Sequence, residues 1–164
     1  MYSPFLYSRV KDFVNKYGVG IAQSIANTGL YFPAVAGQSA YESGYGDKIP
    51  EGSNNFGGIK YSPNLNGVVG YVTSDTTEFI NGKKVKVKQN FAKFKDVKSG
   101  FDAHVQVLMA DRYKSARLNA KSPEEQILMI AKSGYTTTPP QQYLDSMKGI
   151  IEATRDYSKL GRIV

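Results

Sequence analysis

The segment GYVTSDTTEFINGKKVKVKQNF, residues 70–91, departs from the helical spacing found in the rest of the chain. Apolar and polar residues alternate on both sides of Asn81-Gly82, and an Asn-Gly pair between two alternating runs is a strong signal for a two-residue β-hairpin turn. Such a turn would pair Glu78 with Val85. The sequence therefore predicts an antiparallel hairpin inserted into a mainly helical chain.

The predicted register gives the hairpin two different faces, because opposed residues of an antiparallel pair lie on the same side of a sheet. We expect the more apolar face, which carries Glu78, to turn toward the body of the protein. A β-bulge would reverse this expectation, since a shift of one residue exchanges the faces. The apolar face consists of Thr76, Glu78, Ile80, Val85, Val87 and Phe91, and the basic face of Asp75, Thr77, Phe79, Lys84, Lys86 and Lys88.

Three helices are expected before the hairpin. The first is amphipathic and extends to about Gly18, and the second is ended by Gly29. Pro33 suits the first turn of the third helix, and Gly44 suits the residue after its end. Glu42 therefore falls in the last turn of a short, buried helix. The inward positions are expected to be Phe5, Leu6, Val10, Phe13 and Val14 in the first helix, Val19, Ala22, Ile25 and Ala26 in the second, and Ala36 and Ala40 in the third.

Helical spacing returns after the hairpin. One helix is expected over residues 97–108, and a second begins at the capping box Ser122-Pro123-Glu124-Glu125 and ends at Gly134. Tyr135 then lies in a tight corner before a last helix. The inward positions are expected to be Val97, Phe101, His104, Val105 and Leu108, then Ile127, Leu128, Ile130 and Ala131, and finally Tyr143, Met147, Ile150 and Ile151.

The composition limits the class of protein. With 164 residues, of which 41% are apolar, the chain is expected to form a single domain over residues 1–164. No cysteine is present, so disulfides and thiolate chemistry are excluded. No apolar run approaches the ~18 residues of a membrane span, and no signal-peptide pattern is visible. The net charge of +7 favours an anionic partner such as nucleic acid, a membrane surface or an acidic cell-wall polymer.

Three side chains are candidates for chemistry. Glu42 lies near a helix C-terminus, where the macrodipole and partial burial would both raise its pKa, as a general acid requires; a solvent-facing Glu is the alternative. Glu78 is either an inward carboxylate or a surface residue paired with Lys83. Tyr135 is either functional or a packed residue with a satisfied hydroxyl. The single histidine, His104, is interpreted as a core residue, which argues against Ser-His-Asp catalysis and against metal sites built on several histidines.

Four segments follow one another in a specific order. They are QSAYESGYG (38–46), NNFGGIK (54–60), TTEFINGKKVKVKQNFAKFKDVKSGFDAH (76–104) and SGYTTTPPQQY (133–143). In this order and spacing they resemble glycoside hydrolase family 73, the peptidoglycan-cleaving glucosaminidase domains of flagellar rod-cap muramidases, bacterial autolysins and phage lysins. The resemblance covers roughly residues 5–155. The chain departs from the family in having no Trp, and in having Thr138 where the family corner often has Asp.

The resemblance implies a mainly α, lysozyme-like fold in which a sugar-binding cleft separates a helical lobe from a small β-hairpin lobe. It places the family's catalytic Glu on Glu42, its second acidic residue on Glu78 and its corner tyrosine on Tyr135. It also implies a monomer that acts on peptidoglycan glycan strands in the bacterial cell wall, without cofactor, metal, nucleic acid or membrane insertion. The expected substrate contacts are Tyr45, Asn55, Phe56, Gly57 and Lys60.

Two mechanisms and several functions stay open at this point. Glu78 could activate water in an inverting reaction, or the 2-acetamido group of the substrate could attack while Tyr135 steadies it. Lytic transglycosylases and N-acetylmuramidases act on the same polymer, and a non-catalytic cell-wall-binding or assembly module could keep the same cleft. A nucleic-acid binder is supported only by the net charge, because the basic hairpin face has no row of stacking aromatics.

Overall fold

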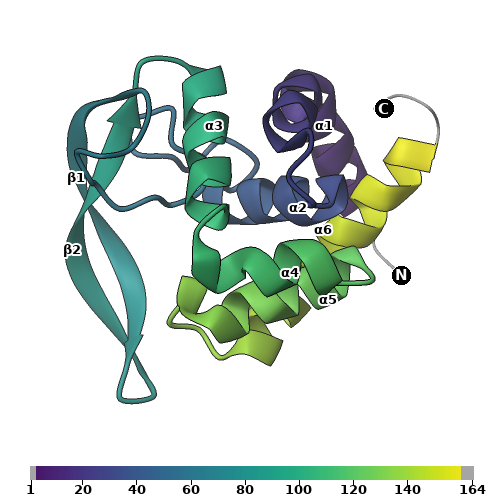
Figure 1. Cartoon of the computed structure of the whole chain (residues 1–164). Helices are drawn as coiled ribbons and strands as arrows, with labels where there is room; N and C mark the ends of the chain where they lie inside the picture. Colours follow the sequence, from purple (N-terminus) through teal and green to yellow (C-terminus); the bar gives the residue numbers. More distant parts are fainter. Residues whose placement is uncertain (1–2, 160–164) are drawn as a thin grey trace.

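The computed structural model describes the backbone of residues 3–159 and the side chains of residues 3–155. A group of helices forms one part of the molecule, and the hairpin stands beside it (Figure 1). None of the helices within residues 3–159 combines the length and apolar character needed to cross a bilayer. In chain order the elements are α1 (Pro4–Ile25), α2 (Phe32–Ser43), β1 (Val68–Ile80), β2 (Lys83–Phe94), α3 (Val97–Leu108), a 3₁₀ turn (Asp111–Tyr113), α4 (Lys114–Asn119), α5 (Pro123–Ile130), a π-helical turn (Ala131–Tyr135) and α6 (Pro140–Lys159).

The hairpin has the predicted register. Glu78 opposes Val85, and Asn81 and Gly82 have φ values of 51° and 77°, as a type I′ turn requires. A register shift occurs near the start of β1, far from the turn, and it leaves the faces around Glu78 unchanged. Glu78 therefore lies on the predicted face.

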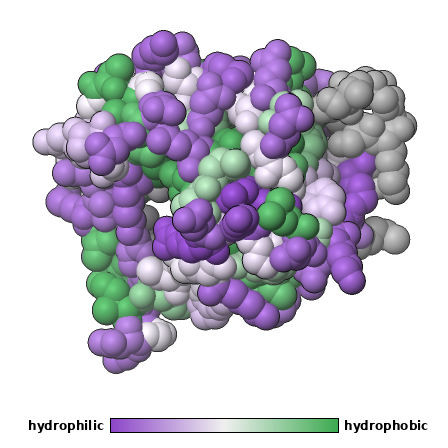
Figure 2. Space-filling view, in the orientation of Figure 1, coloured by the Kyte–Doolittle hydropathy of each residue, from purple (hydrophilic) through white to green (hydrophobic). Residues whose placement is uncertain are grey.

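That face turns toward the helices along only part of its length. Phe91 on β2 is buried, whereas Ile80 and Val85 are 46% and 38% exposed. The hairpin tip extends past the helices in Figure 1, and hydrophobic residues are visible in green near the tip in Figure 2. The expectation of an inward apolar face is thus confirmed at the base of the hairpin and wrong at its tip.

The base of the hairpin is attached to the loop that follows α2. The Ala92 N–H donates to the Ile59 carbonyl at 2.9 Å, and the Tyr61 N–H donates to the Asn90 carbonyl at 2.8 Å. Residues 59–61 therefore run beside β2 like a short third strand. This pairing places Lys60 at the edge of the hairpin.

The first two predicted helices are one continuous helix, α1. The break expected near Gly18 does not occur, because a glycine costs a helix interior only about 1 kcal/mol and this stretch is packed against the core. The uninterrupted helical phase buries Ile21 and leaves Val19 65% exposed. Phe5, at the outer end of the helix, is 75% exposed, and Ala26, just after the end of α1, is also exposed. The predicted inward positions Phe5, Val19 and Ala26 are therefore wrong.

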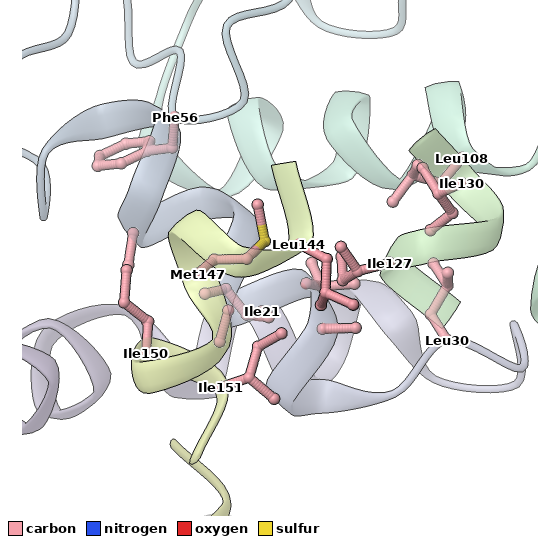
Figure 3. Close-up of a cluster of buried hydrophobic side chains, with 14 of the residues drawn as sticks. Ile21, Leu30, Phe56, Leu108, Ile127, Ile130, Leu144, Met147, Ile150 and Ile151 are labelled. Carbon is pink, nitrogen blue, oxygen red and sulfur yellow. The ribbon is translucent and has the colours of Figure 1, made fainter. Parts of the chain in front are cut away.

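The short helix α2 lies among the other helices because many of its buried residues, such as Ala36, Gly37 and Ala40, are small. A β-carbon at Gly37 would lie only 2.9 Å from Cγ1 of Ile151 on α6. Ala36 and Ala40 are buried, as predicted. Figure 3 shows the surrounding core, with Ile21 from α1 near Met147, Ile150 and Ile151 from α6. This close packing holds the C-terminal end of α2, which carries Glu42.

The corner before α6 forms as predicted. The Ser122 hydroxyl caps α5 by accepting from the Glu125 N–H at 3.1 Å. The chain then passes through the π-helical turn, where Gly134 has a φ of 91° that favours glycine. Tyr135 follows at the corner. The short helix α4 and the 3₁₀ turn before it were not predicted, because such short elements leave too few residues for a periodic pattern.

Candidate active site

A cleft of about 860 Å³ separates the hairpin from the helical body. One wall comes from the C-terminal end of α2 and the loop after it, and another comes from residues 74–78 of β1. The corner at residues 134–138 closes a third side. The predicted site residues that line this cleft are Glu42, Asn55, Gly57, Lys60, Glu78 and Tyr135.

Glu42 projects from the last turn of α2 into the cleft. Gly44 ends the helix in the left-handed conformation, with a φ of 55°, so the chain turns away directly after this carboxylate. The Tyr143 hydroxyl donates to Oε1 of Glu42 at 3.0 Å. The other oxygen, Oε2, faces Gly58, where an added β-carbon would lie 3.4 Å away. Glycine at position 58 therefore leaves this oxygen accessible from the cleft.

Burial raises the pKa of Glu42 to about 7. The hydrogen bond from Tyr143 acts in the opposite direction, and the negative charge of Glu78 adds a smaller upward contribution. The pKa of Tyr143 itself is raised well above its usual value by burial and by the charge of Glu42, so its hydroxyl keeps its proton. Glu42 can thus carry a proton near neutral pH, as a general acid must.

Glu78 occupies the opposite wall in a different environment. Lys60 Nζ lies 3.0 Å from one carboxylate oxygen, and the Thr137 hydroxyl donates to the other at 2.7 Å. Partial burial acts to raise the pKa of Glu78, but the hydrogen bonds from Thr137 and Lys60 and the charge of Lys60 hold it below its usual value. Glu78 is therefore ionised near neutral pH, where Glu42 can still carry a proton.

Tyr135 lies in the corner between the π-helical turn and α6. Its hydroxyl donates to the Gly57 carbonyl at 3.2 Å and lies 3.4 Å from Nε2 of His104. Burial and the charge of Glu42 raise the pKa of Tyr135 well above its usual value. The hydroxyl is therefore a neutral group beside the cleft and a hydrogen-bond donor.

The loop after α2 is held rigidly, and two of its predicted substrate contacts serve that purpose in this structure. The Asn55 side chain bonds the backbone of Ile59 through both its oxygen and its nitrogen, and it also donates to the Ala92 carbonyl at 2.9 Å. Phe56 is buried and stacks on Phe101 with ring centroids 4.9 Å apart. These side chains shape the cleft, while the backbone at Gly57 and Gly58 lines it.

Tyr45 is the predicted contact that the structure keeps apart from the others. It does not line the cleft, and its ring packs under the Arg9 guanidinium at 4.8 Å. Its backbone has a φ of 61°, in the left-handed region that follows Gly44. The turn that frees Glu42 thus directs Tyr45 toward α1.

The hydrogen-bond donors to the two carboxylates in the cleft, Tyr143 and Thr137, were not predicted as part of a site. Tyr143 was expected only as an inward residue of the last helix, and Thr137 only as part of a corner. Both act over long sequence distances, since Tyr143 is 101 residues from Glu42 and Thr137 is 59 residues from Glu78. Single-sequence periodicity contains no signal for such pairs. No group of three or more potential metal ligands occurs within the described residues.

The fold and the cleft together define a class of protein. A helical scaffold with a two-stranded sheet brings together one carboxyl group that is protonated near neutral pH and one that is ionised, which is the pairing that glycosidases use. A model of the glucosaminidase family, described as mannosyl-glycoprotein endo-beta-N-acetylglucosaminidase, matches residues 20–156. The chain belongs to this family, and the resemblance noted from its four segments is confirmed.

Curated relatives have similar sequences over most of this chain. The peptidoglycan hydrolase FlgJ of Salmonella typhimurium is 25% identical over 154 residues, which cover 91% of this chain and 48% of the relative. The peptidoglycan hydrolase FlgJ of Pseudomonas aeruginosa is 30% identical over 129 residues, which cover 75% of this chain and 31% of the relative. The chain thus spans at most about half the length of these relatives.

Solved structures confirm the lysozyme-like fold. A peptidoglycan hydrolase mutant from Sphingomonas sp. A1 superposes with a TM-score of 0.77 at 21% identity, covering 91% of this chain and 97% of that one. A C-terminally truncated glycoside hydrolase domain of Salmonella typhimurium FlgJ gives a TM-score of 0.67 at 24% identity, covering 90% and 98%. At these identities the likeness establishes the fold alone.

Proposed function

We propose that this protein is a peptidoglycan hydrolase that cleaves β-1,4 glycosidic bonds of the bacterial cell-wall glycan as an endo-β-N-acetylglucosaminidase, with Glu42 as the general acid. The observation that carries the proposal is the state of Glu42. It lies in an open cleft, accepts one hydrogen bond from Tyr143, and has a pKa of about 7 because of burial. Family membership over residues 20–156 supports the reaction class.

In this reaction Glu42 donates its proton to the glycosidic oxygen as the bond to the anomeric carbon breaks. Of the two routes to the second step, we favour attack by the substrate's own 2-acetamido oxygen on the anomeric carbon, which forms a cyclic oxazolinium intermediate. Water then attacks this intermediate and passes a proton to the Glu42 carboxylate. The lowered pKa of Glu78 supports this choice, since a carboxylate paired with Lys60 is a weak base for activating water.

The remaining groups of the cleft then have distinct roles in the proposal. The Tyr135 hydroxyl, beside the Gly57 carbonyl, steadies the attacking acetamido group. The Glu78 charge stabilises the positive charge of the oxazolinium from the opposite wall. The proposed place of action is the cell wall and the proposed partner is the glycan strand, bound by one copy of the chain.

The products of purified peptidoglycan test the proposal. After digestion, mass spectrometry of borohydride-reduced fragments should find N-acetylglucosamine at the new reducing ends. Muramic acid at those ends would identify an N-acetylmuramidase, and anhydro-muramic ends would identify a lytic transglycosylase. Binding to the wall without new ends would identify a non-catalytic module and reject the proposal.

A further inference from the structure

A line of buried polar side chains runs from Glu42 into the protein behind the cleft. Gln38 Nε2 lies 3.2 Å from the Tyr143 hydroxyl, and Gln38 Oε1 lies 3.0 Å from Nε2 of His104. The Ser39 hydroxyl lies 3.2 Å from Nδ1 of His104. Gln38, Ser39 and His104 are fully buried. With Tyr143 and Glu42 they form what we call the acid-positioning chain.

The ionised state of Glu42 determines the direction of the first two hydrogen bonds. A carboxylate only accepts, so the single Tyr143 hydrogen points to Glu42. The Tyr143 oxygen must then accept from Gln38, which presents its NH₂ group to Tyr143 and its carbonyl oxygen to His104. Amide orientation follows from the hydrogen-bond network in this way.

The same logic determines the tautomer of His104. Burial lowers the pKa of His104 to about 4, so the ring is neutral and carries one proton. That proton must be on Nε2, because Gln38 presents an acceptor there. Nδ1 is then free to accept from the Ser39 hydroxyl. The hydrogen of the Tyr135 hydroxyl consequently goes to the Gly57 carbonyl and not to His104.

Because the hydrogen bonds of the acid-positioning chain between Gln38 and Glu42 all point toward Glu42, they affect where protonated Glu42 can carry its proton. A proton on Oε1 would point at Tyr143, whose oxygen already accepts from Gln38, and the Tyr143 hydrogen would lose its acceptor. A buried donor without a partner is unfavourable. The proton is therefore kept on Oε2, the oxygen that faces Gly58 and the cleft.

We propose that Gln38 and His104 are positioning residues, which act through Tyr143 to keep the acid proton of Glu42 on the oxygen that faces the cleft. The inference deepens the proposed function and rests on Glu42 being its acid. The two residues do not touch the substrate. Their effect is on which oxygen is protonated and on the balance between the two states of Glu42.

The tautomer of His104 tests the geometry without any activity measurement. His104 is the only histidine, so the imidazole signals of untagged, ¹⁵N-histidine-labelled protein need no assignment to a residue. The two ring nitrogens differ in their couplings to the ring C–H protons. We expect a neutral ring with the proton on Nε2 from pH 5 to pH 9. A proton on Nδ1, or a charged ring at pH 6, would overturn the proposal.

Gln38→Leu tests the effect on the reaction, and Gln126→Leu is the matched control. Gln126 is also fully buried and makes its hydrogen bonds to the backbone of Tyr31, Gly29 and Ala116, away from the cleft. Without Gln38, the Tyr143 oxygen can accept from protonated Glu42. We expect kcat to fall about tenfold with KM unchanged, and the basic limb of the kcat–pH profile to move up by about one pH unit.

The control separates positioning from stability. Gln126→Leu is expected to lower the melting temperature and to leave the position of the basic limb unchanged. If Gln38→Leu leaves that limb in place, the proposal is wrong, even if its kcat falls. If Gln38→Leu fails to fold, the tautomer of His104 in the wild-type protein still decides whether the proposal holds. Loss of activity in every variant, including the control, would point to instability and would leave the NMR result as the deciding measurement.

Discussion

The two walls of the cleft hold the same type of side chain in opposite electrostatic environments. Glu42 on the helical wall has one neutral hydrogen-bond donor, Tyr143, and burial dominates its pKa. Glu78 on the hairpin wall has a cation and a hydroxyl, Lys60 and Thr137, and these partners outweigh burial. The difference shows that the surroundings, and not the residue type, decide which carboxyl group keeps a proton near neutral pH.

The two walls also differ in how they are held. The end of α2 is enclosed by packed helices, with Gly37 in close contact with Ile151. A two-stranded hairpin has little stability of its own, so its position depends on contacts with the rest of the protein. Thr137 supplies one of them, since its hydroxyl accepts from the Phe79 N–H at 3.1 Å and donates to Glu78. The closely packed wall holds the carboxyl group with the raised pKa, and the hairpin wall is positioned partly by contacts of its own carboxylate.

Substitution of Glu42 is expected to have the largest effect on the reaction. Glu42→Gln keeps the shape of the side chain and removes the titrating proton, and general acid catalysis contributes ~10²–10⁴-fold, so we expect at least a hundredfold loss of kcat. The assay is clearance of purified cell walls together with release of reducing ends. Glu125→Gln, which lies at the start of α5 away from the cleft, should keep wild-type activity. Wild-type activity of Glu42→Gln would remove the assignment of the acid.

The raised pKa of Glu42 also predicts a pH-dependent gain in stability for the same variant. Unfolded Glu titrates near 4.5 and folded Glu42 near 7, so between these values the folded state binds the extra proton and wild-type stability falls as pH rises. Gln at position 42 does not titrate. Urea unfolding should therefore show Glu42→Gln to be more stable than wild type at pH 8, by at most about 3 kcal/mol, with little difference at pH 4.5. An equal gain in the free energy of unfolding at both pH values would contradict the raised pKa of Glu42.

The next largest effect is expected at the corner that joins the walls. If the acetamido group attacks, Tyr135→Phe removes the hydroxyl that steadies it, and kcat should fall by about 10- to 100-fold. A thiazoline that mimics the oxazolinium should bind wild type tightly and this variant weakly, because intermediate mimics exploit the preorganised contacts. Tyr61→Phe, outside the cleft lining, is the control. Unchanged kcat together with no thiazoline binding would reject the substrate-assisted route.

Local sequence signals predicted where the two carboxylates lie. The hairpin register, and with it the face of Glu78, came from the Asn81-Gly82 turn, because local turn geometry determines pairing. The position of Glu42 at a helix end came from Pro33 and Gly44. These local signals were sufficient to predict the positions of the two carboxylates in the fold.

The partners of the carboxylates were not predictable, because they are brought in by tertiary packing. Tyr143 has the spacing of a core residue, and nothing local shows that its hydroxyl reaches Glu42. Asn55 and Phe56 belong to a segment that resembles a substrate-binding loop, yet their side chains are used to hold that loop. The continuous helix α1 was not predicted, because a glycine such as Gly18 indicates a helix end when its packing is unknown. Local pattern predicts elements, and contact between elements determines which polar atoms remain for a ligand.

The smallest expected effect separates the charge of Glu78 from its role in holding the hairpin. Glu78→Gln removes the charge and weakens the contact with Lys60, whereas Lys60→Met breaks the ion pair and leaves the carboxylate. In the substrate-assisted route the charge only stabilises the oxazolinium, so kcat should fall less than about tenfold in Glu78→Gln and less still in Lys60→Met. Equal losses of kcat in both variants would mean that the ion pair, and not the charge of Glu78, supports the reaction.

If Glu78 instead activates water, Glu78→Gln should lose as much activity as Glu42→Gln. Added azide should then restore turnover as an external nucleophile, with inversion at the anomeric carbon. Measuring kcat for the three variants side by side, with and without azide, therefore decides whether the two carboxylates act as an acid and a base or as an acid and an electrostatic support.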